Sequence, residues 1–119
     1  MNLTLLKCKL HRATVTQADI DYEGSISIDR TLMEAVGLLE HEKVSIYNIT
    51  NGERLSTYVI PAPHDSGTIG INGAAAKKVS SGDLVIICAY AEMTVSEAKA
   101  YTPTVILLDE DNKPKGTAK

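Results

Sequence analysis

The dipeptide Gly24-Ser25 has the residue types that could cut this chain from within. It ends the segment Tyr22-Glu23-Gly24-Ser25 and places a hydroxyl directly after a glycine carbonyl that is approachable from either face. If the backbone is strained there, the Ser25 oxygen can attack the Gly24 carbonyl, because glycine tolerates conformations that side chains forbid. The peptide bond would become an ester, and elimination across Ser25 would break the chain. Taken alone, the tetrapeptide fits a plain turn better, since Gly-Ser is common in loops.

A second unusual stretch is Asn72-Gly73-Ala74-Ala75-Ala76. An Asn-Gly turn followed by small residues exposes backbone N–H groups at the start of a short helix, and such a place can hold an anion. A tight strand-to-helix turn that packs on a neighbour explains these residues equally well.

Two groups of polar side chains share faces of expected strands. Lys7, Lys9 and His11 alternate with apolar residues, so the two cations could hold a carboxylate if their face lines a cleft. A solvated surface is the favoured interpretation at this point. Arg54 and Tyr58 likewise share one face with residue 56, while residues 55, 57 and 59 occupy the other.

Hydrophobic periodicity and turn residues predict the elements that position these groups. A long half-buried strand is expected over 3–15, and a helix over 32–36 is expected to be capped by Asp29 or Thr31 and ended by Gly37. Asn51-Gly52 predicts a hairpin. The further expected elements are strands over 44–49, 53–60, 68–71, 84–91 and 104–108, a helical turn over 96–100, and a loose tail over 110–119.

Length and composition favour one mainly β domain spanning residues 1–119. The chain is 44% hydrophobic but only 4% aromatic, without Trp or Phe, so Val, Ile, Leu and Ala must form the core. The order short helix, turn, strand occurs twice, at 35–46 and 76–86. Two such units in a small β-rich chain suggest a closed barrel with few exposed edges.

Charge and motif content exclude several classes of protein. A net charge of −3 argues against nucleic acid as the main partner. Cys8 and Cys88 match no metal or redox spacing, and the three histidines share no metal-ligand spacing. No targeting segment or membrane span is expected. The sequence therefore predicts a cytoplasmic protein with free thiols, no metal and no membrane partner.

Four blocks of sequence together resemble the pyruvoyl-dependent aspartate decarboxylase family. They are Lys9-Leu10-His11-Arg12, Tyr22-Glu23-Gly24-Ser25, the segment Asn51-Gly52-Glu53-Arg54-Leu55-Ser56-Thr57-Tyr58, and Asn72-Gly73-Ala74-Ala75-Ala76. The resemblance extends from about Leu3 to Leu108 and reverses the preference for a plain turn at Gly24-Ser25. It implies a double-psi β-barrel with short helices and a homotetramer.

The resemblance also implies a chemistry. Ser25 would become a pyruvoyl group after self-cleavage, leaving a β chain of residues 1–24 and an α chain of residues 25–119, with no metal and no pyridoxal phosphate. A Schiff base between the substrate amine and the pyruvoyl carbonyl would provide the electron sink for loss of CO₂. L-Aspartate would yield β-alanine, a precursor of pantothenate.

Site roles follow from the same resemblance. Ser25 and Tyr58 would be catalytic, with Tyr58 as the acid that reprotonates the substrate. The residues implied to bind substrate are Lys9, Arg54, Thr57, Gly73, Ala74 and Ala75. Those implied to support the site are His11, Tyr22, Gly24 and Asn72.

Two positions depart from the family pattern, and two alternatives stay open. Position 47 is Tyr where some relatives are expected to have Trp, and Cys8 stands where a small residue is familiar. One alternative is a pyruvoyl decarboxylase for another amino acid. The other is a non-catalytic double-psi barrel that serves as an interaction module and leaves Gly24-Ser25 uncut.

Overall fold

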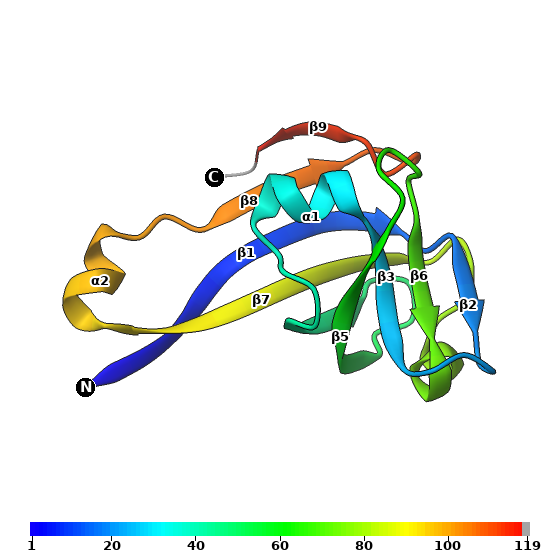
Figure 1. Cartoon of the computed structure of the whole chain (residues 1–119), viewed down its shortest axis with the longest axis horizontal. Coiled ribbons are helices and arrows are strands. Elements are labelled where there is room, and N and C mark those ends of the chain that lie inside the picture. The colour runs from blue at the N-terminus through cyan, green and yellow to red at the C-terminus, as the bar shows by residue number, and fades with distance from the viewer. Residues whose placement is uncertain (118–119) are drawn as a thin grey trace.

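The architecture is given by a computed structural model that describes residues 1–117. Its elements, shown in Figure 1, are β1 (Asn2–Thr14), β2 (Gln17–Asp19), β3 (Ser25–Asp29), α1 (Arg30–Val36), β4 (Lys43–Asn48), β5 (Arg54–Ala62), β6 (Ile69–Asn72), the 3₁₀ helix η1 (Gly73–Lys78), β7 (Leu84–Thr94), α2 (Val95–Ala100), β8 (Thr104–Leu108) and β9 (Pro114–Thr117). The strands pair in the order β2-β6-β3-β5-β4-β7-β1-β8-β9. The protein is therefore mainly β with short helices, as predicted.

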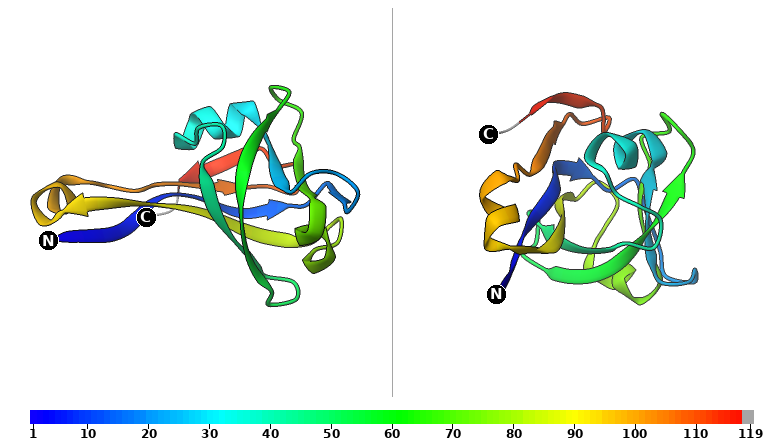
Figure 2. Two further views of the ribbon diagram at one scale, coloured as in Figure 1. Left: turned by 60° about the horizontal axis from the view of Figure 1, so that its bottom comes forward. Right: turned by 60° about the vertical axis from the view of Figure 1, so that its left-hand side comes forward.

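The sheet curls into a barrel, which Figure 2 shows from two further directions. Just beyond β1, the Thr16 N–H donates to the Ile69 carbonyl of β6 at 2.8 Å. This bond joins strands that are far apart in the pairing order. Because β3 also pairs in parallel with β5, and β1 with β8, the chain crosses over between neighbouring strands. This topology agrees with the predicted barrel fold.

Alternation along the strands builds the core. In β1, Cys8 and Leu10 are buried while Lys9 between them is half-buried, as period two requires. The residues that are completely buried are mostly β-branched, which suits packing on a pleated surface. The largest of them are Leu10, Ile26, Ile28, Leu32, Ile46, Ile69, Ile71, Ile87, Val15, Val44, Val59 and Val85.

Helix α1 begins at Asp29, one of the two predicted caps. The Asp29 carboxylate accepts a hydrogen bond from the Thr31 N–H at 2.9 Å, and Gly37 ends the helix with φ of 82°. The same carboxylate, which is only 1% exposed, also accepts from the N–H groups of Asp65 and Gly67, each at 2.9 Å. Asp29 therefore fastens the loop before β6 to the start of α1.

We expect Asp29 to make the fold sensitive to acid. Burial alone would raise the pKa of Asp29, but the N–H donors of Gly67, Thr31 and Asp65 lower it below its usual value. A lowered folded-state pKa stabilises the fold above the unfolded-state pKa, and this stabilisation is lost as pH falls through the folded-state pKa. Asp29→Asn should reduce the free energy of unfolding near neutral pH by about 1–3 kcal/mol.

Urea unfolding between pH 3 and 7 checks this expectation. The variant should also show a weaker loss of stability toward low pH than the parent chain. Asp21→Asn is the matched control, because Asp21 is exposed. Equal acid slopes for the parent and Asp29→Asn would contradict the assignment.

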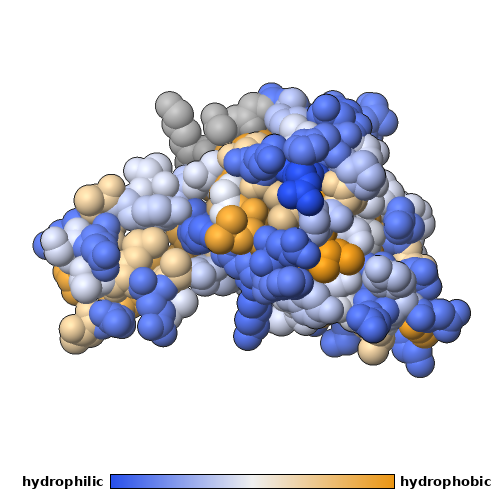
Figure 3. All heavy atoms as spheres, in the orientation of Figure 1, coloured by the Kyte–Doolittle hydropathy of each residue, from blue (hydrophilic) through white to orange (hydrophobic). Residues whose placement is uncertain are grey.

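An arm projects from the barrel (Figures 1 and 2). It consists of residues 2–6 of β1, residues 90–94 of β7, and α2, with Asn2 opposite Thr94 and Leu6 opposite Tyr90. The expected strand over 84–91 thus continues three residues further, to Thr94. Figure 3 shows apolar side chains along this arm. The arm leaves Leu3 and Leu5 only half-buried within one chain.

Two expectations about strand ends were wrong. The strand expected over 53–60 continues through Pro61 to Ala62, because Pro61 pairs with Ile28 of β3 and the last bond toward the β4 side is that of the Val59 N–H to the Glu42 carbonyl, at 3.0 Å. Residues 110–117 are not a loose tail: they form a turn and β9. Residues 118–119 lie outside the described chain.

Asn112 explains the order of this C-terminal segment. It is 1% exposed and adopts a φ of 59°, which Asn tolerates better than most residues. Its side chain accepts from the Thr14 N–H at 2.7 Å and donates to the carbonyls of Thr14 and Gly67, both at 2.8 Å. The turn is therefore tied to the end of β1 and to the loop before β6.

Candidate active site

Ser25 begins β3 and is 1% exposed. Its paired residue on the neighbouring strand β6 is Asn72. The Asn72 side-chain amide donates to the Ser25 hydroxyl oxygen at 2.9 Å and to the Ser27 hydroxyl oxygen at 3.0 Å. The Ser25 hydroxyl in turn donates to the Glu23 carbonyl at 3.4 Å. The hydroxyl next to the Gly24 carbonyl is thus held in place on both sides.

The start of η1 packs directly on Gly24. Gly73 has a φ of 74°, and a Cβ built there would lie 2.7 Å from the Gly24 Cα. Only glycine at position 73 permits this contact. Gly24 itself has no positive φ, and a Cβ there would meet no atom within 4 Å. The predicted backbone strain at Gly24 is therefore not seen as a positive φ, and the steric need for glycine lies at position 73.

Tyr58 lies on the strand next to Ser25. Ile26 pairs with Val59 in parallel, so Tyr58 occupies the register position beside Ser25, and paired residues share a face of the sheet. Tyr58 is 39% exposed, and the centroid of its ring lies 6.2 Å from that of His41. This face, which we call the outer face, carries the predicted nucleophile and the predicted acid.

Thr57 lies on the opposite face. It pairs with the buried Val44 and is half-buried, as alternation from Tyr58 requires. Because Val59 pairs with Ile26, Thr57, two residues before Val59, lies in the part of β5 that borders the beginning of β3. The structure places Thr57 near the Gly24-Ser25 segment but does not bring it onto the face of Arg54 and Tyr58.

The two predicted carboxylate-binding cations, Lys9 and Arg54, also lie on the outer face. Arg54 pairs with Tyr47, and its guanidinium carbon lies 4.8 Å from the centre of the Tyr47 ring. Lys9 pairs with Cys88 of β7 and is half-buried. Lys7 is different, because its ammonium binds the Glu42 carboxylate at 2.8 Å and the Gly37 carbonyl at 2.9 Å. Of the two N-terminal lysines, Lys9 is the one left for a ligand.

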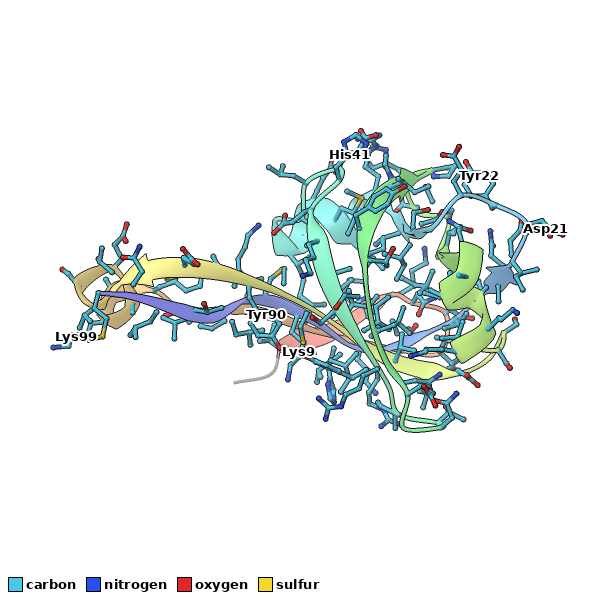
Figure 4. All side chains as sticks on the ribbon, turned by 90° about the horizontal axis from the view of Figure 1, so that it is seen from below. Lys9, Asp21, Tyr22, His41, Tyr90 and Lys99 are labelled. Carbon is cyan, nitrogen blue, oxygen red and sulfur yellow. The ribbon has the colours of Figure 1, made fainter. Side chains whose placement is uncertain are left out.

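One chain does not bring Lys9 to Ser25. In the pairing order, β5, β4 and β7 stand between β3 and β1. Figure 4 shows Lys9 near Tyr90, whereas Tyr22, which leads into Ser25, lies at another edge of the molecule. Lys9 and the segment that leads into Ser25 therefore lie at different edges of one chain.

His11 lies two residues beyond Lys9 and has a buried polar atom without a partner. Its Nδ1 makes no hydrogen bond within the described residues. Burial and the nearby charges of Lys9 and Arg12 lower the pKa of His11. The ring is therefore neutral near pH 7 and retains one ring nitrogen for a further contact.

Sequence reasoning missed two contributors. Ser27 shares the amide of Asn72 with Ser25, and the period-two spacing from Ser25 could have revealed it. The pairing of Tyr47 with Tyr90, whose hydroxyl oxygens lie 2.9 Å apart, had no local signal because the residues are far apart in sequence. In residues 1–117, no group of three or more His, Cys, Asp or Glu side chains could hold a metal ion. No helix of this segment has the length and apolar character needed to cross a membrane.

Comparisons with known proteins give one consistent result. The model of the family described as aspartate decarboxylase matches residues 1–115. The aspartate 1-decarboxylase of Maricaulis maris is 62% identical over 113 residues, covering 95% of this chain and 93% of the relative. That of Caulobacter vibrioides is 59% identical over 118 residues, covering 99% and 100%. That of Clostridium beijerinckii is 59% identical over 115 residues, covering 97% and 93%.

Proposed function

The chain belongs to the aspartate decarboxylase family, and we propose that it makes its own catalytic group by cutting itself between Gly24 and Ser25. It is an enzyme, a carboxy-lyase that converts L-aspartate to β-alanine and CO₂ for pantothenate synthesis. The relatives favour aspartate over another amino acid as substrate. The observation that carries the self-cleavage proposal is the buried hydroxyl of Ser25, the residue directly after Gly24, which the Asn72 amide holds in place.

Self-cleavage would proceed in three steps. The Ser25 oxygen attacks the Gly24 carbonyl carbon, and the peptide bond is replaced by an ester. Elimination then releases residues 1–24 with a C-terminal carboxylate and leaves a double bond in residue 25. Water finally replaces the nitrogen of residue 25, which leaves as ammonia, and the product is the pyruvoyl carbonyl.

The residues around Ser25 fit this group. The Asn72 amide, which donates to the oxygen of residue 25 in the uncut chain, can donate to an oxygen acceptor there after cleavage. The pyruvoyl carbonyl supplies an electrophile for the substrate amine and a sink for electrons. Thr57 and the backbone of Gly73, Ala74 and Ala75 would close the pocket around the substrate, with Tyr22 and His11 as supporting residues.

The intact mass of the purified protein tests the proposal. After incubation we expect two chains, residues 1–24 and residues 25–119, and the longer one should be lighter by one ammonia than simple hydrolysis would leave it. An interaction module would instead persist as one full-length chain. Persistence of the uncut chain under all conditions, including incubation with cell extract, would overturn the proposal.

Arg54 is proposed to select a dicarboxylic substrate, because its planar fork matches a carboxylate in a way that a lysine ammonium cannot. Arg54→Lys should lower kcat/KM for aspartate by about one to two powers of ten, given roughly 1.5–3 kcal/mol for a charge-assisted hydrogen bond. Arg30→Lys, at an exposed position of α1, is the matched control. Unchanged kinetics in Arg54→Lys would remove Arg54 from the site.

We place the complete site between subunits of a homotetramer. Two observations support this placement: Figure 4 shows Lys9 at another edge of the chain than Tyr22, and the arm leaves apolar residues half-buried. A second copy that supplies Lys9 would complete the pocket and would also cover apolar surface. The same proposal locates the enzyme in the cytoplasm, in keeping with its two free thiols, Cys8 and Cys88.

Mixed oligomers test the shared site. Co-expression of Ser25→Ala and Lys9→Ala chains should restore about one quarter of the sites, because random pairing in a symmetric oligomer gives that fraction one intact residue from each chain. Each variant expressed alone should be inactive or nearly so, and sedimentation should give a tetramer. Mixed oligomers without activity, despite a cleaved Lys9→Ala chain, would show that each chain needs its own Lys9.

A further inference from the structure

Two tyrosines on neighbouring strands form a hydrogen bond between their hydroxyl groups next to Arg54. Tyr47 lies on β4 and Tyr90 on β7, and their hydroxyl oxygens are 2.9 Å apart. The Arg54 guanidinium lies over the ring of Tyr47, at 4.8 Å from its centre. A continuous line of contacts thus connects Tyr90 with Arg54 through Tyr47.

The strand register shows how the two tyrosines meet. Tyr47 pairs with Ile86, four residues before Tyr90, and Ser45 pairs with Cys88 between them. For the hydroxyls to bond, both side chains must lean toward each other along the outer face. Cys88 lies on that face beneath them, which explains why it is only 4% exposed.

This arrangement fixes the ring of Tyr47. A tyrosine on a sheet surface otherwise rotates among rotamers, and a hydrogen bond at the tip of the ring restricts both of its side-chain torsions. Arg54 has no carboxylate partner within 4 Å in the described residues, so the aromatic ring is what orients its exposed guanidinium. The hydrogen bond with Tyr47, together with burial, raises the pKa of Tyr90, so the Tyr90 hydroxyl stays protonated well above neutral pH.

We propose that Tyr90 is a positioning residue: its hydroxyl holds the Tyr47 ring under Arg54 and so presets the guanidinium fork for the substrate carboxylate. The inference rests on the proposed role of Arg54 in substrate binding. A guanidinium group that is already held in place loses less conformational entropy when the substrate binds. Tyr90 therefore affects aspartate binding through Tyr47 and Arg54 and does not touch the substrate itself.

Two hydroxyl deletions test the inference in the self-processed enzyme. Tyr90→Phe and Tyr47→Phe keep both rings and remove one hydroxyl each. Each should raise KM for aspartate by about three- to tenfold, the range expected for one lost hydrogen bond between neutral groups, with kcat nearly unchanged. The double variant should be no worse than either single variant, because both remove the same bond. Tyr101→Phe is the matched control, since its hydroxyl bonds to the Lys7 carbonyl and not to Tyr47.

A second readout follows the bond itself. Spectrophotometric titration of the parent enzyme should show a tyrosine that ionises at unusually high pH, and this late transition should disappear in both single variants but persist in Tyr101→Phe. Cleavage at Gly24-Ser25 and thermal unfolding should change little in any of them. A parent enzyme without a late transition, or a late transition unchanged in Tyr47→Phe, would show that the Tyr47 hydroxyl does not hold Tyr90 in solution and would overturn the inference.

The Arg54→Lys variant separates the two possible failures. If Arg54→Lys is impaired while Tyr90→Phe has the parent KM, Arg54 binds substrate without help from Tyr90, and only the inference fails. If Arg54→Lys also has the parent kinetics, the proposed role of Arg54 fails and the inference fails with it. A fall in kcat equal to the rise in KM would point to a structural defect and would likewise contradict a positioning role.

Discussion

Ser25→Ala protein is expected to remain a single full-length chain and to show no measurable decarboxylation of aspartate. The substitution removes the only atom of Ser25 that can attack the Gly24 carbonyl, so neither the ester nor the pyruvoyl carbonyl can form. The fold should survive, because Ala fits the space of Ser and the core residues of β3, Ile26 and Ile28, are untouched. The measurement is intact mass over days of incubation, with activity assayed on the same samples.

Ser27→Ala is a demanding control for this experiment. Ser27 lies on the same face of β3 and receives the second hydrogen bond of the Asn72 amide, at 3.0 Å against 2.9 Å for Ser25. Both variants therefore disturb the same amide, but only one removes the proposed nucleophile. Ser27→Ala should still be cut, at a lower rate if Asn72 becomes less well held. Cleavage of the Ser25→Ala chain between residues 24 and 25 would exclude Ser25 as the nucleophile.

Local sequence patterns predicted the elements that carry these groups. Alternation of apolar and polar residues predicted β1 and the two faces of β5. Asn51-Gly52 correctly predicted the hairpin between β4 and β5. Gly37 and Asp29 bound α1 as predicted, whereas Thr31, the other predicted cap, does not cap it. Asp29 takes that role because its carboxylate also satisfies the loop before β6, a contact that no local pattern reveals.

Contacts between distant segments could not be predicted from spacing. Ser25 and Asn72 are 47 residues apart, and only the β3–β6 register brings the amide to the hydroxyl. The resemblance to a family named both residues but gave no geometry. The polar composition of residues 110–119 led to the wrong prediction of a loose tail. It cannot show that the Asn112 side chain makes three hydrogen bonds with backbone groups.

The arm shows the same limit in another form. Its residues on β1 and β7 alternate as a half-buried strand should, yet within one chain nothing covers Leu3 and Leu5 completely. Alternation in the sequence predicts which face of a strand is apolar. It does not predict whether the same chain or a second molecule covers that face. The separation of Lys9 from Ser25 is likewise a property of the barrel that the order of the motifs along the chain conceals.

Tyr58→Phe is expected to cut normally and to decarboxylate slowly. Tyr58 stands beside Ser25 on the neighbouring strand, on the same face as Arg54, so β5 can present both a carboxylate-binding group and a proton donor to one substrate. Phe keeps the ring that packs near His41 and removes only the hydroxyl. The barrel should therefore fold, and pyruvoyl formation should stay near normal if the hydroxyl has no part in processing.

The expected loss concerns the proton that replaces CO₂ on the substrate. Help from a positioned general acid is commonly worth about 10²–10⁴-fold, so kcat of Tyr58→Phe should fall into that range. The experiment measures aspartate turnover together with the mass of the longer chain, so that incomplete processing cannot be mistaken for slow chemistry. Tyr101→Phe again provides the matched deletion of a tyrosine hydroxyl, because that hydroxyl bonds to the Lys7 carbonyl. A Tyr58→Phe enzyme that is fully cleaved and turns over at the parent rate would rule out Tyr58 as the acid, because water or another side chain would then deliver the proton equally well.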